Sequence, residues 1–193
     1  MKSIEPPDIH HLKAAEGWLE LGNHLEAYEE LKKIDIQMRF HPLVLLARWE
    51  IYARGKHWEF AHTIAQGLVA LVPDEPRAWI NRSFALHQMK RTREAWYDLL
   101  PAAEKFPEHP AVAYDLACYA CQLGRFDEAL AVIDALPDIE KSRPERVPYL
   151  AVIYASAHRT EDARAALRRA PPSRALLPEE AALLRKAERI LTP

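Results

Sequence analysis

Small and apolar residues recur along the chain with a period of 34 residues. The clearest column holds alanine at every position: Ala27, Ala61, Ala95, Ala129 and Ala163. Residues four and seven places beyond each alanine are also apolar, which puts all three on one face of an α-helix. Proline marks the same period at Pro42, Pro76, Pro110, Pro144 and Pro178. The pattern therefore predicts a chain built of repeated helical units.

Each unit reads as two antiparallel helices joined by a tight turn. The first half of a unit carries its own helical stripe, as at Trp79, Ser83 and Leu86, and a short break such as "LGRFDEA" separates the halves. The column alanine has a physical reason, because a larger side chain would hold two closely crossing helices apart. We expect the units to span 8–41, 42–75, 76–109, 110–143 and 144–177.

This organisation resembles the tetratricopeptide repeat family. The third unit matches its pattern best, with Trp79 at position 4, Ser83 at 8, Ala95 at 20, Leu99 at 24 and Pro107 at 32. The resemblance implies an all-α fold, a right-handed solenoid of five helical hairpins that occupies the chain as one domain, 1–193. Residues 178–191 resemble the family's C-terminal capping helix, since they begin with proline and carry acids before bases.

Several residues depart from the family pattern. Trp49 stands at position 8 of the second unit, where a small residue is usual, and Gly55 comes one place early, so we expect a rotated helix or a longer turn. Pro101 should kink its helix, because proline removes a hydrogen bond and clashes with the preceding turn. Pro137 should end its helix early. The next helix should begin near Pro148, after a link of irregular geometry.

The resemblance also implies a binding surface. In the family, positions 2, 5, 9, 12 and 13 of each unit face a concave wall that commonly binds extended peptides or partner helices. Carried onto this sequence, these positions predict a groove that is apolar and aromatic in the middle, with a polar rim. The groove residues expected to contact a partner are Leu46, Glu50, Arg77, Ile80, Phe84, His87, Tyr114 and Cys118. The alternative is that they pack only against adjacent units.

The expected function is a non-catalytic protein-interaction scaffold that takes a peptide or helical segment of a partner protein. One alternative is a secretion-type chaperone that sequesters an apolar segment, which five units and a short leader fit less well. Another is a regulatory or structural subunit of a complex that works through its outer surface.

Two arginines give a separate hypothesis. Arg48 and Arg82 both occupy position 7, usually leucine, in neighbouring units. Two guanidinium groups one repeat apart could hold a carboxylate or a phosphate. The alternative is that each arginine extends to water or pairs with an acid of the same chain.

The two cysteines, Cys118 and Cys121, form a C-x-x-C pair inside a predicted helix. Structural zinc takes about four ligands, and only His87 is a conceivable third here. A redox pair gains its low pKa at a helix N-terminus, whereas this pair lies well inside its helix. Helix packing is therefore the favoured interpretation. Without a glycine-rich phosphate loop, G-x-S-x-G or H-E-x-x-H, we expect no catalytic residue, cofactor or metal.

Charge and composition narrow the class of protein. A net charge of -2 argues against a dedicated nucleic-acid binder. No stretch approaches the roughly 18 apolar residues of a membrane span, and the start lacks the apolar run of a secretory signal, so we expect a cytoplasmic protein without membrane contact.

Charge is also uneven along the chain. Asp8 to Asp35 holds seven acids and three lysines, whereas Arg143 to Arg174 holds seven arginines and three acids. A weak homo-oligomer through the acidic N-terminal and basic C-terminal ends is one expectation, and ordinary solvated faces are the other.

Overall fold

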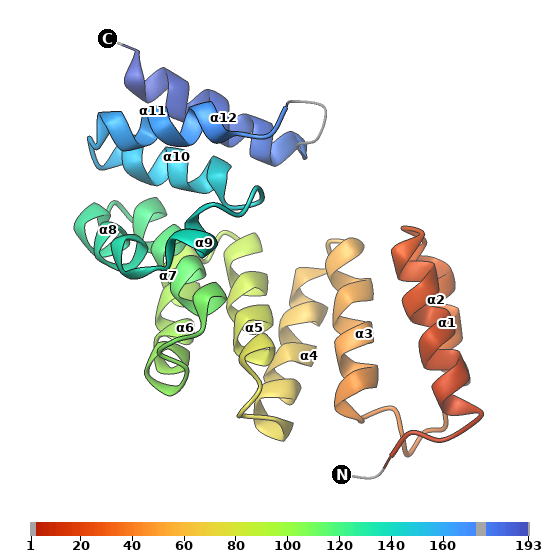
Figure 1. The fold of residues 1–193 in the computed structure, drawn as a ribbon. Helices are drawn as coiled ribbons and strands as arrows, with labels where there is room; N and C mark the ends of the chain where they lie inside the picture. The colour runs from red at the N-terminus through yellow and green to blue at the C-terminus, as the bar shows by residue number, and fades with distance from the viewer. Residues whose placement is uncertain (1–2, 173–176, 193) are drawn as a thin grey trace. The chain divides into compact units, whose positions relative to one another are not determined.

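The computed structural model of the chain describes residues 3–172 and 177–192. In this part of the chain every regular element is helical, so the expected all-α fold class is confirmed (Figure 1). The helices are α1 (Asp8–Glu20), α2 (His24–Lys33), α3 (Pro42–Arg54), α4 (Trp58–Leu71), α5 (Pro76–Gln88), α6 (Thr92–Lys105), α7 (Pro110–Gln122), α8 (Phe126–Ala135), α9 (Asp138–Lys141), α10 (Val147–Ser156), α11 (Thr160–Arg169) and α12 (Pro178–Leu191).

The helices gather into two compact units, residues 1–102 and 103–193. In the first unit α1 packs against α2, α3 against α4, and α4 against α5. In the second, α7 packs against α8, α10 against α11, and α12 covers α10. The single domain expected over 1–193 stays a prediction. No helix within the described residues is both long and apolar enough to cross a membrane.

Small residues close the crossings between paired helices. The column alanine has no exposed surface in any of its five occurrences, at Ala27, Ala61, Ala95, Ala129 and Ala163. Position 8 of the first helices is equally inaccessible at Ala15, Ser83, Ala117 and Ala151. A methyl or hydroxymethyl group fills each crossing, so a larger side chain there would have to displace a neighbouring helix.

Five hairpin turns share one backbone conformation at intervals of 34 residues. The residues Gly22, Lys56, Lys90, Gly124 and His158 all have a positive φ between 58° and 79°. In each turn the next residue donates a hydrogen bond to a carbonyl five places earlier, as from His57 to Tyr52 at 2.8 Å. This arrangement satisfies carbonyls at the end of one helix and reverses the chain into the next.

The first helices begin where the sequence places proline. Pro42, Pro76, Pro110 and Pro178 are the first residues of α3, α5, α7 and α12. Proline suits this position because its fixed φ is already helical and its missing N–H is not needed there. The residue before it adds a cap in two cases, since the His41 ring accepts from the Leu43 amide and the Glu75 carboxylate accepts from the Arg77 amide.

The irregular positions resolve differently. The lengthened turn considered for the second unit is absent, because α3 has the same 13 residues as α5 and its turn follows at Lys56. The helix α6 continues through Pro101 to Lys105. As expected, α8 ends before Pro137 and α10 begins at Val147 with Pro148 in its first turn. The link between them contains the short helix α9.

Candidate functional site

First helices of the hairpins line a hollow in each compact unit. The N-terminal hollow has a volume of about 350 Å³ and lies among α1, α3 and α5. Its lining residues are Glu16, Leu19, Glu20, Leu43, Leu46, Ala47, Glu50, Arg54 and Arg77. Three of the predicted groove residues, Leu46, Glu50 and Arg77, therefore lie together around one concavity.

The N-terminal hollow presents charges of both signs. Glu50 and Arg54 form an ion pair at 2.7 Å, one turn apart on α3, and their side chains are about two-fifths exposed. Such a surface pair contributes little to stability, so each partner remains open to competition from a bound ligand. The Arg77 side chain borders the hollow from α5. The hollow can therefore bind a polar backbone or charged side chains.

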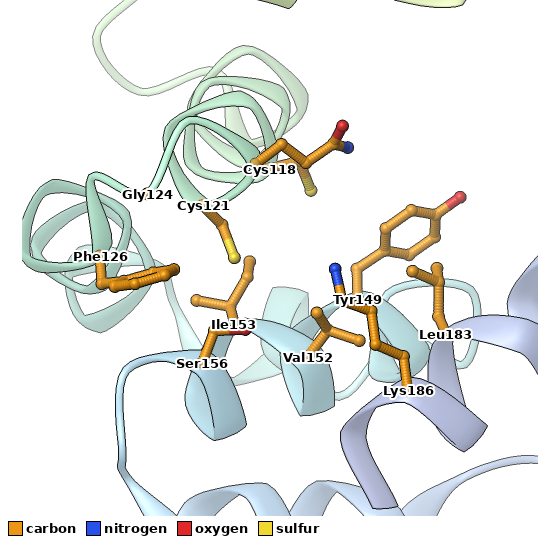
Figure 2. A pocket seen from close by; sticks show the side chains of 11 residues that line it. Cys118, Cys121, Gly124, Phe126, Tyr149, Val152, Ile153, Ser156, Leu183 and Lys186 are labelled. Carbon is orange, nitrogen blue, oxygen red and sulfur yellow. The ribbon is translucent and has the colours of Figure 1, made fainter. Parts of the chain in front are cut away.

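The C-terminal hollow is larger and more apolar, with a volume of about 540 Å³ (Figure 2). It is bordered by α7, α10 and α12, and by Phe126 at the start of α8. The lining residues are Cys118, Cys121, Gln122, Gly124, Phe126, Tyr149, Val152, Ile153, Ser156, Leu183 and Lys186. Figure 2 shows Lys186 extending from α12 into the space, where it is the single charged residue of this lining. The hollow therefore combines an apolar surface with one positive charge.

The cysteines belong to the wall of the C-terminal hollow. The Cys121 sulfur points from α7 toward Ile153 and Ser156 of α10 (Figure 2). Burial raises the pKa of both thiols, and Asp115 raises the pKa of Cys118 further. A raised pKa keeps a thiol protonated, which is the opposite of what a redox pair or a metal ligand requires. No group of three or more metal-ligating side chains gathers in the described residues.

Phe84 and His87 are engaged within the protein. The Phe84 ring lies 6.4 Å from the Trp49 ring and 5.8 Å from the Trp58 ring, measured between centroids. Phe84 thus packs α5 against α3 and α4. His87 Nδ1 lies 3.0 Å from the Thr92 hydroxyl, and burial lowers the pKa of its imidazole. These contacts agree with the alternative that such residues pack against neighbours, while Ile80 of the same helix is half-buried.

Tyr114 is buried beside the link that precedes α10. Its hydroxyl donates to the Arg146 carbonyl oxygen at 3.3 Å, and the Arg146 guanidinium lies 5.0 Å from its ring centroid. The Tyr149 ring meets Tyr114 edge-on at 5.9 Å. Tyr114 lines neither hollow, whereas Tyr149 lines the C-terminal one. The tyrosine that a ligand in this hollow can reach is therefore Tyr149.

Arg48 and Arg82 lie in different surroundings. Arg82 pairs with Asp98 at 2.8 Å, and its guanidinium lies 4.9 Å from the Trp79 ring centroid. This is the pairing with an internal acid that the sequence left open. Arg48 instead lines a small cavity together with Tyr28 and Tyr52, which Arg82 does not line.

Several lining residues were missing from the sequence expectations. Val152 and Ser156 occupy positions 9 and 13 of the unit that begins at Pro144, so the rule used for earlier units would have found them. Leu183 and Lys186 lie on α12, for which the repeat gives no inward positions. Only packing of α12 against α10 identifies them.

Known proteins share this architecture. Residues 86–147 match the family model described as tetratricopeptide repeat. PilW, a widely conserved type IV pilus biogenesis factor, has a crystal structure similar over 97% of this chain and 87% of its own, with a TM-score of 0.77 and 17% identity. A thermophilic TPR protein in Thermus thermophilus is similar over 95% of this chain and 98% of its own, with a TM-score of 0.72 and 19% identity.

A double mutant of MamA from RS-1 is similar over 97% of both chains, with a TM-score of 0.66 and 16% identity. None of the curated proteins compared with the chain matches it. At these identities the solved structures show a shared fold, and the family assignment comes from the matched segment together with the repeated hairpins. The chain belongs to the tetratricopeptide repeat family, its family match spanning residues 86–147.

Proposed function

We propose that the chain is a non-catalytic scaffold whose first helices bind a peptide or helical segment of a partner protein. The observation that carries this proposal is the pair of hollows, each lined mainly by first helices and, in the C-terminal unit, by α12. Repeat proteins of this kind present such surfaces to their ligands. The cytoplasmic location stays a prediction.

The lining favours an amphipathic segment. Val152, Ile153 and Leu183 offer an apolar surface in the C-terminal hollow, and Lys186 adds a cation that would pair with an acidic group beside an apolar side chain. The N-terminal hollow, with its carboxylates and guanidinium groups, suits a more polar stretch. Both ligand types occur in extended peptides and in amphipathic helices.

The decisive experiment uses two neighbouring residues of α12. Lys186 and Arg185 are both exposed, but only Lys186 lines the hollow. Cross-linking in native cells, followed by quantitative mass spectrometry, would compare wild type with Lys186→Glu and Arg185→Glu. We expect Lys186→Glu to lose partners that Arg185→Glu retains. Arg77→Glu tests the N-terminal hollow, with the exposed Arg93→Glu as its control. Unchanged partners in both hollow variants would contradict the proposal.

The alternative of an outer-surface subunit also has an observation in its favour. An apolar hollow of about 760 Å³ lies between α7 and α8 on other faces of these helices. Its lining includes Leu116, Ala131, Val132, Ala135 and Leu136. Val132→Glu in the same cross-linking experiment separates the two surfaces. Loss of partners in this variant alone would favour the outer-surface function.

A further inference from the structure

A small cavity in the N-terminal unit gathers positive charge. It has a volume of about 190 Å³ and lies between α2, the loop after it, and α3. The lining residues are Tyr28, Leu31, Lys32, Arg39, Arg48 and Tyr52. The lining thus contains three cationic side chains and two phenols, and no carboxylate is among these lining residues.

The cavity and the N-terminal hollow use opposite faces of α3. Leu46 and Glu50 line the hollow, whereas Arg48 and Tyr52 line the cavity. Residues two places apart on an α-helix point about 200° away from each other, since each residue turns the helix by about 100°. A ligand in the cavity is therefore separate from a peptide in the hollow.

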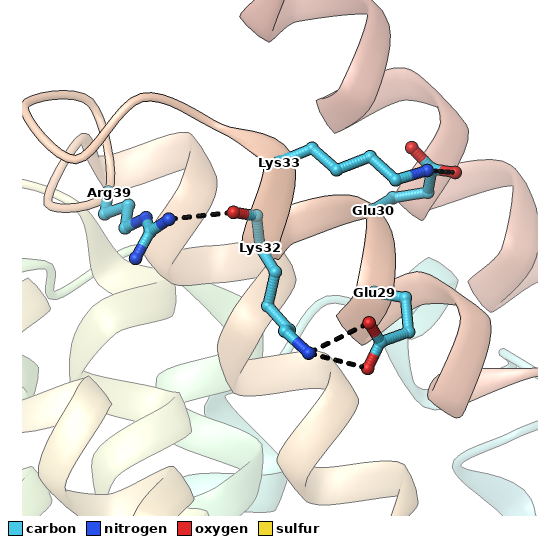
Figure 3. Close-up of polar contacts among 5 residues, drawn as sticks. All are labelled: Glu29, Glu30, Lys32, Lys33 and Arg39. Carbon is cyan, nitrogen blue, oxygen red and sulfur yellow. Dashed lines mark hydrogen bonds and ion pairs between the residues drawn. The ribbon is translucent and has the colours of Figure 1, made fainter.

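Arg39 is fixed in place without a carboxylate. Its Nε donates to the Ile34 carbonyl oxygen at 3.0 Å and its Nη2 to the Lys32 carbonyl oxygen at 2.8 Å (Figure 3). Both acceptors belong to the C-terminal end of α2. These bonds orient the guanidinium plane before any ligand arrives, and they leave its formal charge uncancelled.

Arg48 has no ion-pair partner within the described part of the chain. By contrast, Arg54 on the same helix pairs with Glu50, and Arg82 pairs with Asp98. Arg48 lies near the Tyr52 hydroxyl: burial raises the pKa of Tyr52, and the charge of Arg48 acts against that rise. The Tyr28 and Tyr52 rings lie 6.4 Å apart, so both phenols border the same space.

Lys32 can add a third charge. Its ammonium lies 2.9 Å from the Glu29 carboxylate, and both side chains are 55% exposed (Figure 3). An exposed pair of this kind is worth at most about 1 kcal/mol, so a stronger anion can draw the lysine away.

We propose that this cavity binds a phosphoryl group, either free or carried on a small ester. Arg39 and Arg48 provide two planar guanidinium groups, which match phosphate oxygens with paired N–H donors. The Tyr28 and Tyr52 hydroxyls supply further donors. A phosphoryl dianion uses more of these donors and charges than a carboxylate does, so it is the preferred oxyanion. The Arg48 half of the sequence hypothesis is thereby retained, with Arg39 in place of Arg82.

Isothermal titration of the full chain with inorganic phosphate tests the proposal. Chloride adjusts every solution to the same ionic strength, because diffuse attraction is screened by salt. We expect one saturable site in wild type and binding about tenfold weaker in Arg48→Gln, the loss of one charge-assisted contact. Arg54→Gln removes the same charge from the same helix outside the cavity and should bind as wild type does.

Two further ligands define the chemistry. Acetate should bind at least about tenfold more weakly than phosphate, since it carries one charge and fewer acceptor oxygens. Phosphoserine with blocked termini should bind at least as well as phosphate if the natural ligand is a phosphate ester, and more weakly if it is the free anion. No saturable phosphate binding, equal losses in Arg48→Gln and Arg54→Gln, or acetate binding as tight as phosphate would each overturn the proposal.

Folding and the groove are controlled separately. Tyr52→Phe removes one hydroxyl and keeps the ring, so it should weaken phosphate binding even if Arg48→Gln folds poorly. Circular dichroism of each variant checks that the helices are intact. Lys186→Glu should bind phosphate as wild type does, because Lys186 lies in the other compact unit. Failure of the peptide-binding proposal and failure of the phosphate proposal are therefore distinguishable.

Discussion

Arg146 and Glu140 form an ion pair at 2.7 Å although both side chains are almost fully buried. Glu140 belongs to α9, and Arg146 is the residue before α10. The same arginine lies over the Tyr114 ring and accepts the Tyr114 hydroxyl through its carbonyl oxygen. The non-repeating link between α8 and α10 is thus fastened to α7 by one side chain.

Breaking this pair on one side should destabilise the C-terminal unit strongly. Arg146→Met leaves the buried Glu140 carboxylate without its closest cation, so we expect unfolding free energy to fall by about 3 kcal/mol. Arg143 pairs with the same carboxylate at 3.0 Å but is half exposed, so Arg143→Gln should cost about 1 kcal/mol or less. Urea denaturation measures both variants. Equal losses would show that burial of Arg146 does not set its contribution.

Stability should depend on pH through Asp115. Burial raises the pKa of this carboxyl to about 7 from an ordinary value of 3.8, against the lowering effect of Arg146. The folded state therefore holds the proton more tightly than the unfolded state does. The resulting stability is fully present below pH 3.8 and is lost as pH rises through 7, at up to about 1.4 kcal/mol per pH unit.

Asp115→Asn tests this dependence because the amide resembles the protonated carboxyl. We expect the variant to be more stable than wild type at pH 8 and to lose less stability between pH 5 and pH 8, measured by urea denaturation. Asp127→Asn, at an exposed position of α8, serves as control and should keep the wild-type dependence. A wild-type slope in Asp115→Asn would assign the pH dependence to other groups.

The same glycine substitution should have opposite effects at two sites. Gly124 has a φ of 77°, where an L-residue is strained, so Gly124→Ala should lower stability by about 1 kcal/mol. Gly67 lies inside α4, and an added methyl group would meet no atom within 4 Å, so Gly67→Ala should raise stability by about 0.5–1 kcal/mol. Thermal unfolding compares them, and changes of the same sign would refute the conformational explanation.

The alanine column should not tolerate larger residues. Ala61 and Ala70 both lie on α4, but Ala61 is fully buried and Ala70 is exposed. Ala61→Leu forces extra methylene groups into a close helix crossing and should cost about 1–3 kcal/mol, whereas Ala70→Leu should be nearly neutral. Chemical denaturation of the pair measures the difference. A neutral Ala61→Leu would mean that the crossing has room that its burial does not suggest.

Self-association through the two charged ends stays a prediction. Within the C-terminal stretch, Arg159 already pairs with Asp134 and Asp162, and Arg164 pairs with Glu161. These internal pairs reduce the charge that a second copy could use. Light scattering at low and high salt measures the outcome: a larger mass at low salt is expected from charge-driven association, and the same mass at both would exclude it.

The repeating parts of the fold were readable in the sequence because their causes are local. A helical stripe, a proline at the first position and a small residue at a helix crossing act within one hairpin, and they recur because each hairpin meets the same neighbours. Ala61 and Ala95 needed no knowledge of the rest of the molecule. The start of α10 near Pro148 followed from the same reasoning.

The site residues were harder to predict because their partners lie outside the repeat rule. Arg82 meets Asp98 on the following helix, a pairing that no position of the family pattern specifies. Tyr114 is covered by Arg146 because the non-periodic link folds back over it. Arg39 reaches the end of α2 from a loop. Periodicity locates backbones, but it does not determine which long side chains meet.

The five left-handed turn residues fix the unit of growth for this molecule. Each lies at the same distance from the next, and a hydrogen bond across each turn ties it to the preceding helix. Inserting one residue in a first helix would rotate its buried stripe by about 100° and move the turn away from its crossing. Such a chain can lengthen or shorten readily only by whole hairpins, so its evolution is expected to proceed by duplication and loss of modules rather than by gradual changes in helix length.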